Sequence, residues 1–568
     1  MPATVTDGPG GVLRGASYSA PPVRAHETLR TVAVKTLRPG VAVYDLGQNV
    51  SLMPRLRVRG PAGAEVRIIP AELVKPDGSV DRTSVCGGNC SSWWSYTLDG
   101  SAGGEVWFPK FFYHGARYLQ VELSAPAGGR ELPVVDTIEG VVVHSASPPA
   151  GEFACSNELF NRIRTLIRWA QRSNLVSIIT DCPHREKLGW LEQYHLNGPS
   201  LRYEFDLTRL YTKTFGDMAD AQLANGLVPD IAPEFVIFPG GFRDSPEWGS
   251  AIILAAWQQF EWTGDDTPLR RYFPAMRRYV DYLTSRARDH ILAYGLGDWY
   301  DIGPKAPGSS QLTPIALTAT AIYYEDARRL GAIAARLGEE ADARRFSALA
   351  EEIREAFNRK FFDPKKGSYA TGSQCANAMP LVFGLVAPAD RPRVVEALVS
   401  DVRERGLTAG DVGYRYLLRA LAEAGRSDVI YALNNQSEKP GYGYQLAHGA
   451  TSLAEAWNAN RNSSQNHFML GQIMEWFYHD LAGIQPDVAG PGFGRVVIRP
   501  TVAGDLTWVK ASYETLRGTI AVSWRREARK LTLEVSLPPN TTAAVYVPGE
   551  RSSREVGSGV HRFNSVLP

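Results

Sequence analysis

The chain has 568 residues, of which 44% are hydrophobic and 21% are charged, so a disordered or fibrous protein is excluded. Its 61 basic and 60 acidic residues give a net charge of +1, which argues against nucleic-acid binding by phosphate neutralisation. No stretch approaches the roughly 18 apolar residues of a membrane span, so we expect neither nucleic acid nor a membrane as a partner. The length predicts three or four domains.

Residues 1–30 lack the apolar core of a secretory signal. We therefore expect a cytoplasmic protein, or a secreted or periplasmic one if a leader has been removed. Five cysteines are too few for a disulfide framework in a chain of this length. Cys86 and Cys90 form the only close pair, without a second Cys/His pair at zinc spacing. We expect no metal and no cofactor.

The hydrophobic period changes twice along the chain. In residues 1–150, apolar and polar residues alternate, as at Leu56 and Val58, between turns such as 60–63, which predicts an N-terminal β-sandwich domain. In residues 151–488 the period becomes helical, which predicts a toroid of paired helices. In residues 489–568 the alternation returns and predicts a C-terminal β-sandwich domain.

The densest group of chemically active side chains lies at 181–193. Pro183 would break a helix, so we expect a loop at 181–185, followed by a helix with Glu186 and Trp190 on one face. A carboxyl group packed against an indole ring is favoured in its protonated form, which is the state that a general acid needs. The alternative is a helix N-terminus whose acidic residues favour the positive end of the dipole.

A second group lies at 448–457. Gly449 allows close backbone approach, and Thr451 or Ser452 could cap a helix that carries Glu455. A carboxylate that faces a cleft can activate water as a general base. An ordinary solvated glutamate on a helix is the alternative.

Two further loops pair tryptophan with carboxylates, at 244–249 and 297–301. Such rings can stack on a sugar face while the carboxylates bind its hydroxyl groups. Each loop could instead be the start of a helix with a partly buried tryptophan. Serine-hydrolase elbows, phosphate-binding loops and zinc-protease motifs are absent from the sequence.

Together these motifs resemble family 78 glycoside hydrolases, the α-L-rhamnosidases of the six-hairpin glycosidase superfamily. DCPHREKLGW at 181–190 resembles the family's signature loop, and GATSLAEAW at 449–457 resembles a second motif. Asn466 and His467 resemble its downstream Asn-His pair. YDLGQN at 44–49 and FYHGARY at 112–118 resemble the β-domain that precedes the catalytic barrel.

The resemblance implies a multidomain α and β protein, with an (α/α)6 barrel between N-terminal and C-terminal β-sandwich domains. It implies an inverting exo-acting hydrolase that releases terminal α-L-rhamnose from oligosaccharides or rhamnosylated small molecules. Glu186 would be the general acid and Glu455 the general base, with the carboxyl groups about 6.5–9.5 Å apart. The partner would be a carbohydrate substrate, and a homo-oligomer is compatible with the sequence.

The expected substrate-binding residues come from the same motifs and loops. They are Asp181, Arg185, Trp190, Glu192, Gln193, Asp244, Trp248, Asp298, Trp299 and His467.

Two departures from the family pattern bear on the substrate. The signature loop is one residue shorter, and Gln193 stands where the family usually has an acid. Either Glu192 takes over that contact, or the site accepts a different sugar or aglycone. This departure keeps open an inverting hydrolase of another sugar or uronic acid on the same toroid. Two further alternatives are a non-catalytic glycan-binding protein and a polysaccharide lyase, which would use Tyr/His or a base that abstracts the proton α to a uronate carboxyl.

Overall fold

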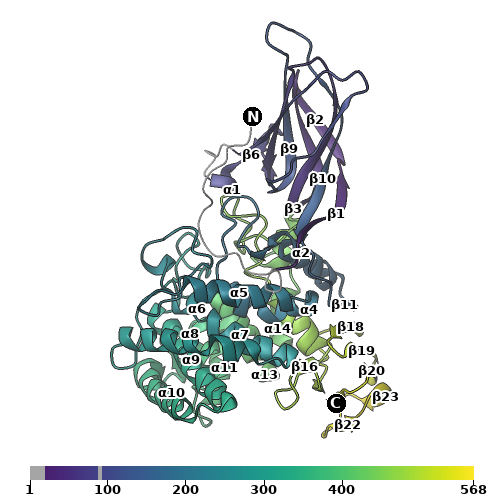
Figure 1. Ribbon diagram of the computed structural model, residues 1–568. Coiled ribbons are helices and arrows are strands. Elements are labelled where there is room, and N and C mark those ends of the chain that lie inside the picture. Colours follow the sequence, from purple (N-terminus) through teal and green to yellow (C-terminus); the bar gives the residue numbers. More distant parts are fainter. Residues whose placement is uncertain (1–19, 87–91) are drawn as a thin grey trace.

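The computed structural model describes residues 20–86 and 92–568, apart from the side chain of Cys86, so the Cys86–Cys90 pair lies outside the described residues. A β-rich N-terminal part, a helical central part and a β-rich C-terminal part follow one another along the chain (Figure 1). In Figure 1 the N-terminal strands rise above the helices, and the yellow C-terminal strands lie beside the helices at the lower right.

The N-terminal part is built around one eight-stranded sheet with the order β1-β10-β3-β9-β4-β7, in which β2 and β8 also pair with β3. Its elements are β1 (Val23–Arg30), β2 (Ala33–Arg38), β3 (Val41–Arg59), β4 (Glu65–Ala71), β5 (Leu73–Val74), β6 (Val80–Asp81), α1 (Thr83–Cys86), β7 (Trp94–Thr97), β8 (Glu105–Trp107), β9 (His114–Ser124) and β10 (Val134–Ser145).

The long strand β3 joins this sheet together. Its first half pairs with β2 and its second half with β8 and β10, while β9 pairs along it on both sides of a register shift between Asp45 and Val50. Leu52, Leu56 and Val58 are completely buried, as the alternating pattern predicts. The irregular stretch around Asn49 contacts the helical domain, because the Asn49 N–H donates to Thr451 Oγ1 and Asn49 Nδ2 donates to Gln465 O.

Helices dominate the central part. Its elements are α2 (Glu158–Asn174), β12 (Leu175–Val176), β13 (Ile178–Ile179), α3 (Gln193–Leu196), α4 (Gly198–Glu204), α5 (Thr208–Ala221), η2 (Gly240–Phe242), α6 (Pro246–Gly249), α7 (Ala251–Thr263), α8 (Thr267–Arg286), α9 (Ile315–Leu337), α10 (Glu340–Phe361), β14 (Phe362–Asp363), β15 (Ser368–Tyr369), α11 (Gln374–Phe383), α12 (Arg391–Arg405), α13 (Asp411–Glu423), α14 (Ser427–Asn434), α15 (Tyr442–Ala447), α16 (Ile473–Glu475) and the π-helical turn η3 (Trp476–Leu481).

Local signals explain where the long helices begin and end. The Asn157 side chain accepts the Phe160 N–H and caps α2. Gly338 adopts a left-handed conformation with φ of +81° and ends α9, so the chain reverses directly into α10. The two helices pack against each other as a hairpin, and α9 also contacts α7, α8 and α11.

Two sheets form the C-terminal part. Its strands are β16 (Ile484–Pro486), β17 (Arg495–Ile498), β18 (Trp508–Thr515), β19 (Gly518–Glu527), β20 (Lys530–Leu537), β21 (Thr542–Val545), β22 (Arg554–Val556) and β23 (Gly559–Val566). One sheet has the order β16-β17-β21-β22, and the other the order β11-β18-β19-β20-β23. Strand β11 (Gly151–Cys155) precedes the helices in sequence, yet it pairs antiparallel with β18.

The sequence predicts three domains, but the apolar cores do not follow this division. The helical and C-terminal parts share one continuous core, whereas the N-terminal sheet has a core of its own. One side chain of the helical part, Trp169 of α2, packs against this N-terminal core. Among the described residues, no helix combines the length and the apolar character needed to cross a membrane.

Glu204, at the end of α4, is a buried carboxylate whose contribution to the stability of the fold can be measured. Its side chain is fully buried, and it binds Arg164 and Arg168 of α2 and the Tyr478 hydroxyl of η3. We expect Glu204→Ala to lower the free energy of unfolding by about 3–5 kcal/mol, because two arginines lose their buried partner. Urea unfolding followed by circular dichroism measures this loss.

Glu152→Ala is the matched control. Glu152 also binds Arg164, at 3.1 Å, but its side chain is 73% exposed. Solvent-exposed ion pairs contribute little, so this variant should remain within about 0.5 kcal/mol of the parent protein. Equal losses in both variants would contradict the role given to Glu204.

Candidate active site

Loops and two short helices of the helical domain, η2 and α6, meet at a cavity of about 100 Å³. Both carboxyl groups that the sequence singled out, Glu186 and Glu455, line it, although they are far apart in the chain. The other lining residues are Asp181, Trp190, Glu192, Phe242, Trp248, Leu296, Trp299, His467 and Met469.

The loop that carries Glu186 does not form the helix that the sequence predicts. Residues 183–186 form a turn, and Lys187 has a left-handed φ of +57°, which prevents helical continuation. Asp181 and Leu188 close the loop with two hydrogen bonds, so α3 starts only at Gln193. The predicted pair still forms, because Trp190 Nε1 donates to Glu186 Oε2 at 3.2 Å. The Glu186 side chain is 36% exposed, more than the desolvated setting inferred from the sequence.

Glu455 also lies in a loop, and the predicted helix cap at Thr451 or Ser452 is not present. Two hydrogen bonds to one residue fix the glutamate instead. The Glu455 N–H donates to Ser464 O at 2.9 Å, and the Ser464 N–H donates to Glu455 Oε2 at 2.8 Å. The side chain is only 8% exposed, so the carboxylate is held firmly at the cavity wall.

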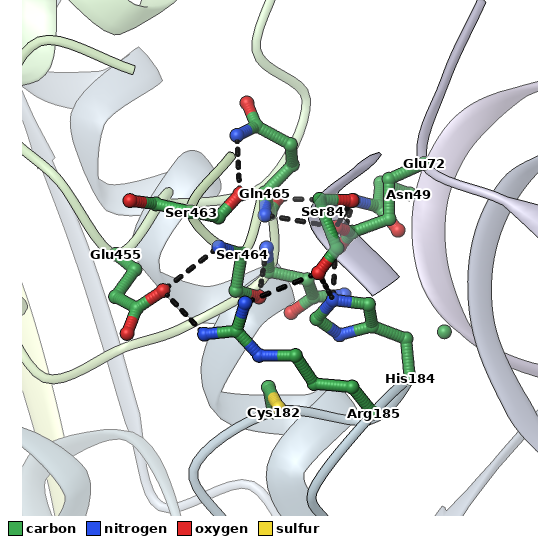
Figure 2. A network of polar contacts seen from close by, with 12 residues as sticks. Asn49, Glu72, Ser84, Cys182, His184, Arg185, Glu455, Ser463, Ser464 and Gln465 are labelled. Carbon is green, nitrogen blue, oxygen red and sulfur yellow. Dashed lines mark hydrogen bonds and ion pairs between the residues drawn. The ribbon is translucent and has the colours of Figure 1, made fainter. Parts of the chain in front are cut away.

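The Arg185 guanidinium connects the two candidate carboxyl groups. Its Nε lies 3.3 Å from Glu186 Oε1, and its Nη2 donates to Glu455 Oε2 at 2.9 Å. Its Nη1 donates to the backbone oxygen of Ser84 at 3.1 Å, in the N-terminal domain. Figure 2 shows the contacts to Glu455 and Ser84. Because the guanidinium is rigid and planar, it restricts how far either carboxyl group can move.

Asp181 and Cys182 are buried close to Glu186. Burial raises the pKa of Asp181 well above its ordinary range, and the Cys182 thiol and the Glu186 charge add to this effect. The Cys182 thiol donates to Asp181 Oδ2 at 2.7 Å. The three side chains bring one potential ligand atom each within 4.8 Å of one another. Structural zinc sites use four ligands, one more than this group offers. The expectation that the protein binds no metal stays a prediction.

Aromatic rings and one imidazole form much of the remaining wall. Trp190 stacks on Phe238 with ring centroids 5.5 Å apart, and Phe242 meets Trp299 edge-on at the same distance. His467 Nδ1 accepts the Met469 N–H, so in the neutral ring Nε2 carries the hydrogen. Burial lowers the pKa of His467 to about 3, so its ring is neutral at physiological pH.

Glu192, rather than Gln193, reaches the cavity. Gln193 is buried behind it and donates to Glu192 Oε1 at 2.6 Å and to Asp411 Oδ2 at 3.2 Å. Glu192 Oε2 has no hydrogen-bond partner. Burial raises the pKa of Glu192 to about 8, so the group is protonated at neutral pH and can donate a hydrogen bond.

Two expected substrate-binding acids lie outside the cavity lining. Asp298 is buried and accepts the N–H groups of Gly410 and Gly413 at 3.1 and 2.7 Å. Asp244 accepts the Tyr282 hydroxyl at 2.5 Å. Their carboxylates therefore brace the loops that place Trp299 and Trp248, and do not face the cavity.

Sequence reasoning missed several residues at the site. Phe242, Leu296 and Met469 line the cavity, but Phe242 ends the three-residue helix η2 and the other two lie in irregular loops, so none belongs to a periodic pattern. Tyr300 lies beside Glu455, and burial together with that charge raises the pKa of Tyr300. Tyr300 belongs to the loop 297–301 that the sequence singled out, but it is not among the expected substrate-binding residues.

Three family models match successive parts of the chain. They describe the bacterial alpha-L-rhamnosidase concanavalin-like domain at residues 35–144, the 6 hairpin glycosidase domain at 148–481 and the C-terminal domain at 483–562. The chain belongs to the bacterial α-L-rhamnosidase family.

Individual relatives agree with this family membership. An α-L-rhamnosidase of Streptomyces avermitilis is 32% identical over 97% of this chain and 55% of its own length. The structure of an α-L-rhamnosidase from Dictyoglumus thermophilum aligns with a TM-score of 0.88 and 33% identity, over 96% of this chain and 64% of that chain. The Streptomyces avermitilis enzyme in complex with L-rhamnose aligns with a TM-score of 0.88 and 31% identity, over 96% and 54% of the two chains. The chain spans about half the length of the curated relatives it matches.

The raised pKa of Glu192 predicts how the stability of this rhamnosidase-family chain depends on pH. A carboxyl group with a raised folded-state pKa binds more protons in the folded than in the unfolded state, so stability falls as the pH rises toward about 8. Buried histidines with lowered pKa values, such as His467, oppose this trend only below about pH 6.5. We therefore expect the free energy of unfolding to fall between pH 6.5 and 8, by at most about 1.4 kcal/mol per pH unit for this one group.

Glu192→Gln should flatten that dependence, because the amide does not titrate. Urea unfolding at pH 6.5, 7.25 and 8 measures the slope for both proteins. Glu438→Gln removes an exposed acid as a control and should keep the parental slope. A slope in Glu192→Gln equal to that of the parent protein would contradict the raised pKa of Glu192.

Proposed function

We propose that this protein is an inverting, exo-acting glycoside hydrolase that releases terminal α-L-rhamnose from oligosaccharides or rhamnosylated small molecules. The observation that carries the proposal is that Glu186 and Glu455 line one cavity and contact the same guanidinium, that of Arg185. Membership of the α-L-rhamnosidase family supports the same reaction.

In this mechanism Glu186 protonates the leaving glycosidic oxygen and Glu455 activates water on the opposite face of the sugar. The Arg185 contacts limit the separation of the contacted carboxyl oxygens to less than about 9 Å, which permits the roughly 6.5–9.5 Å spacing of inverting enzymes. Glu455 Oε2 accepts from both Arg185 and the Ser464 N–H, which suits an acceptor-only carboxylate. Glu186 is held by a different contact, the hydrogen bond that Trp190 Nε1 donates to Glu186 Oε2.

The cavity favours a single apolar-faced sugar ring. Trp190, Trp248 and Trp299 offer flat surfaces that suit the C–H face and methyl group of a deoxy sugar. The relative solved with L-rhamnose supports rhamnose as that sugar.

The finer architecture belongs to the same proposal. We propose that the helical domain is an (α/α)6 barrel and that both flanking β-domains are sandwiches. The antiparallel α9–α10 hairpin and the two-sheet C-terminal part support this arrangement.

Replacing either catalytic carboxyl group by its amide should abolish most turnover. We expect Glu186→Gln and Glu455→Gln each to lower kcat on an aryl α-L-rhamnoside by about 10²–10⁴-fold, because proton transfer is lost. Steady-state kinetics with circular dichroism as a folding check measure this. The exposed Glu404→Gln serves as the control. Near-parental turnover by either active-site variant would reject its role.

The stereochemistry of the first product tests inversion directly. An inverting enzyme acting on an α-L-rhamnoside releases β-L-rhamnose first, because water attacks the face opposite the leaving group. Proton NMR within the first minutes should show the β anomer before mutarotation. An initial α anomer would exclude inversion. A panel of other aryl glycosides tests the alternative of a different sugar.

A further inference from the structure

The buried Glu72 lies outside the catalytic domain but is connected to both catalytic loops. It directly follows β4 in the N-terminal domain, and its side chain is fully buried. Its Oε1 accepts from Asn49 Nδ2 at 3.0 Å. Its Oε2 accepts from Ser84 Oγ at 2.8 Å and from the Gln465 N–H at 3.0 Å, and lies 3.2 Å from His184 Nε2. Figure 2 shows this cluster beside Arg185 and Glu455.

One branch of the cluster leads to the candidate base. Gln465 follows Ser464, which forms both backbone hydrogen bonds that fix Glu455. Asn49 strengthens this branch, because its Nδ2 also donates to Gln465 O at 3.0 Å and its N–H donates to Thr451 Oγ1 at 3.0 Å. The N-terminal domain thus holds the loop of Glu455 on both sides.

The other branch leads to the candidate acid. His184 lies two positions before Glu186, and its Nε2 faces two acceptors, Glu72 Oε2 and the Ser84 backbone oxygen at 3.0 Å. The same Ser84 oxygen accepts from Arg185 Nη1 at 3.1 Å. Arg185 in turn contacts both catalytic carboxyl groups. By fixing the position of Ser84, Glu72 therefore influences the position of Arg185 and, through it, of both carboxyl groups.

We propose that Glu72 is a positioning residue that sets the separation of the two catalytic carboxyl groups from outside the helical domain. The proposal rests on the function proposed above for Glu186 and Glu455. The N-terminal domain has an apolar core of its own, and the Glu72 contacts are among those that join this domain to the two catalytic loops. Removing the carboxylate takes the acceptor away from the Ser84 hydroxyl and the Gln465 N–H, and the two loops lose a contact that they share.

Kinetics of Glu72→Gln test the positioning role. The amide keeps the size of the side chain but turns an NH₂ group toward donors that need an acceptor. Misplacing catalytic groups by about 1 Å lowers rates by about 10²-fold, so we expect kcat on an aryl α-L-rhamnoside to fall by about 10–100-fold. KM should stay within about threefold, because Glu72 does not line the sugar cavity.

Glu105→Gln is the matched control. Glu105 is another buried carboxylate of the N-terminal domain, and it accepts from the Tyr96 hydroxyl and from the N–H groups of Asp99 and Gly100, all in the same domain. We expect this variant to lose stability but to keep its kcat. If Glu72→Gln fails to fold, Asn49→Ala removes two side-chain contacts of the cluster and leaves the carboxylate, and should lower kcat in the same direction.

Hydrogen exchange provides a readout that needs no substrate. Glu72→Gln should accelerate amide exchange in peptides covering 181–190 and 451–467, whereas Glu105→Gln should accelerate it in neither. If the parent protein does not hydrolyse an aryl α-L-rhamnoside, the proposed function fails, and exchange alone decides whether Glu72 holds the loops.

Three outcomes would overturn the positioning role. They are a folded Glu72→Gln variant with kcat within twofold of the parent, an equal loss of kcat in Glu105→Gln, and unchanged exchange in both loop segments.

Discussion

The contact of one guanidinium with two carboxyl groups is the interaction on which the candidate site depends. Glu186 and Glu455 belong to separate irregular loops, and their carboxyl groups would repel each other in one small cavity whenever both were ionised. Arg185 offsets that repulsion with a rigid fork whose other end is fixed on the Ser84 backbone oxygen. The position of this one side chain therefore links the acid, the base and the neighbouring domain.

Buried acids around the cavity provide a second constraint. Burial raises the pKa values of Asp181 and Glu192, both of which line the cavity. A carboxyl group that stays protonated avoids further repulsion beside Glu186 and can donate a hydrogen bond to a sugar hydroxyl. The chemistry of the pocket thus depends on desolvation as well as on which residue types are present.

The division of the apolar core explains why a polar cluster matters at the domain junction. The helical and C-terminal parts are fused by one core, and β11 ties the start of the helical domain to the C-terminal sheet. The N-terminal domain lacks that connection. It contacts the catalytic loops through Asn49, Glu72 and Ser84, and also through Gly115, whose N–H donates to Pro183 O at 2.9 Å. Buried hydrogen bonds are directional, so such a junction can fix the position of a loop more narrowly than apolar contact can.

The sequence by itself determined the order of the β, helical and β regions, because hydrophobic period reports which faces of regular elements are buried. It also supplied the motifs around Glu186 and Glu455 that identified the family. Only the tertiary structure decided that both acids lie on loops rather than helices, that Glu192 and not Gln193 reaches the cavity, and that Glu72 contacts both loops. These features depend on hydrogen bonds between residues far apart in the chain, which leave no local pattern in the sequence.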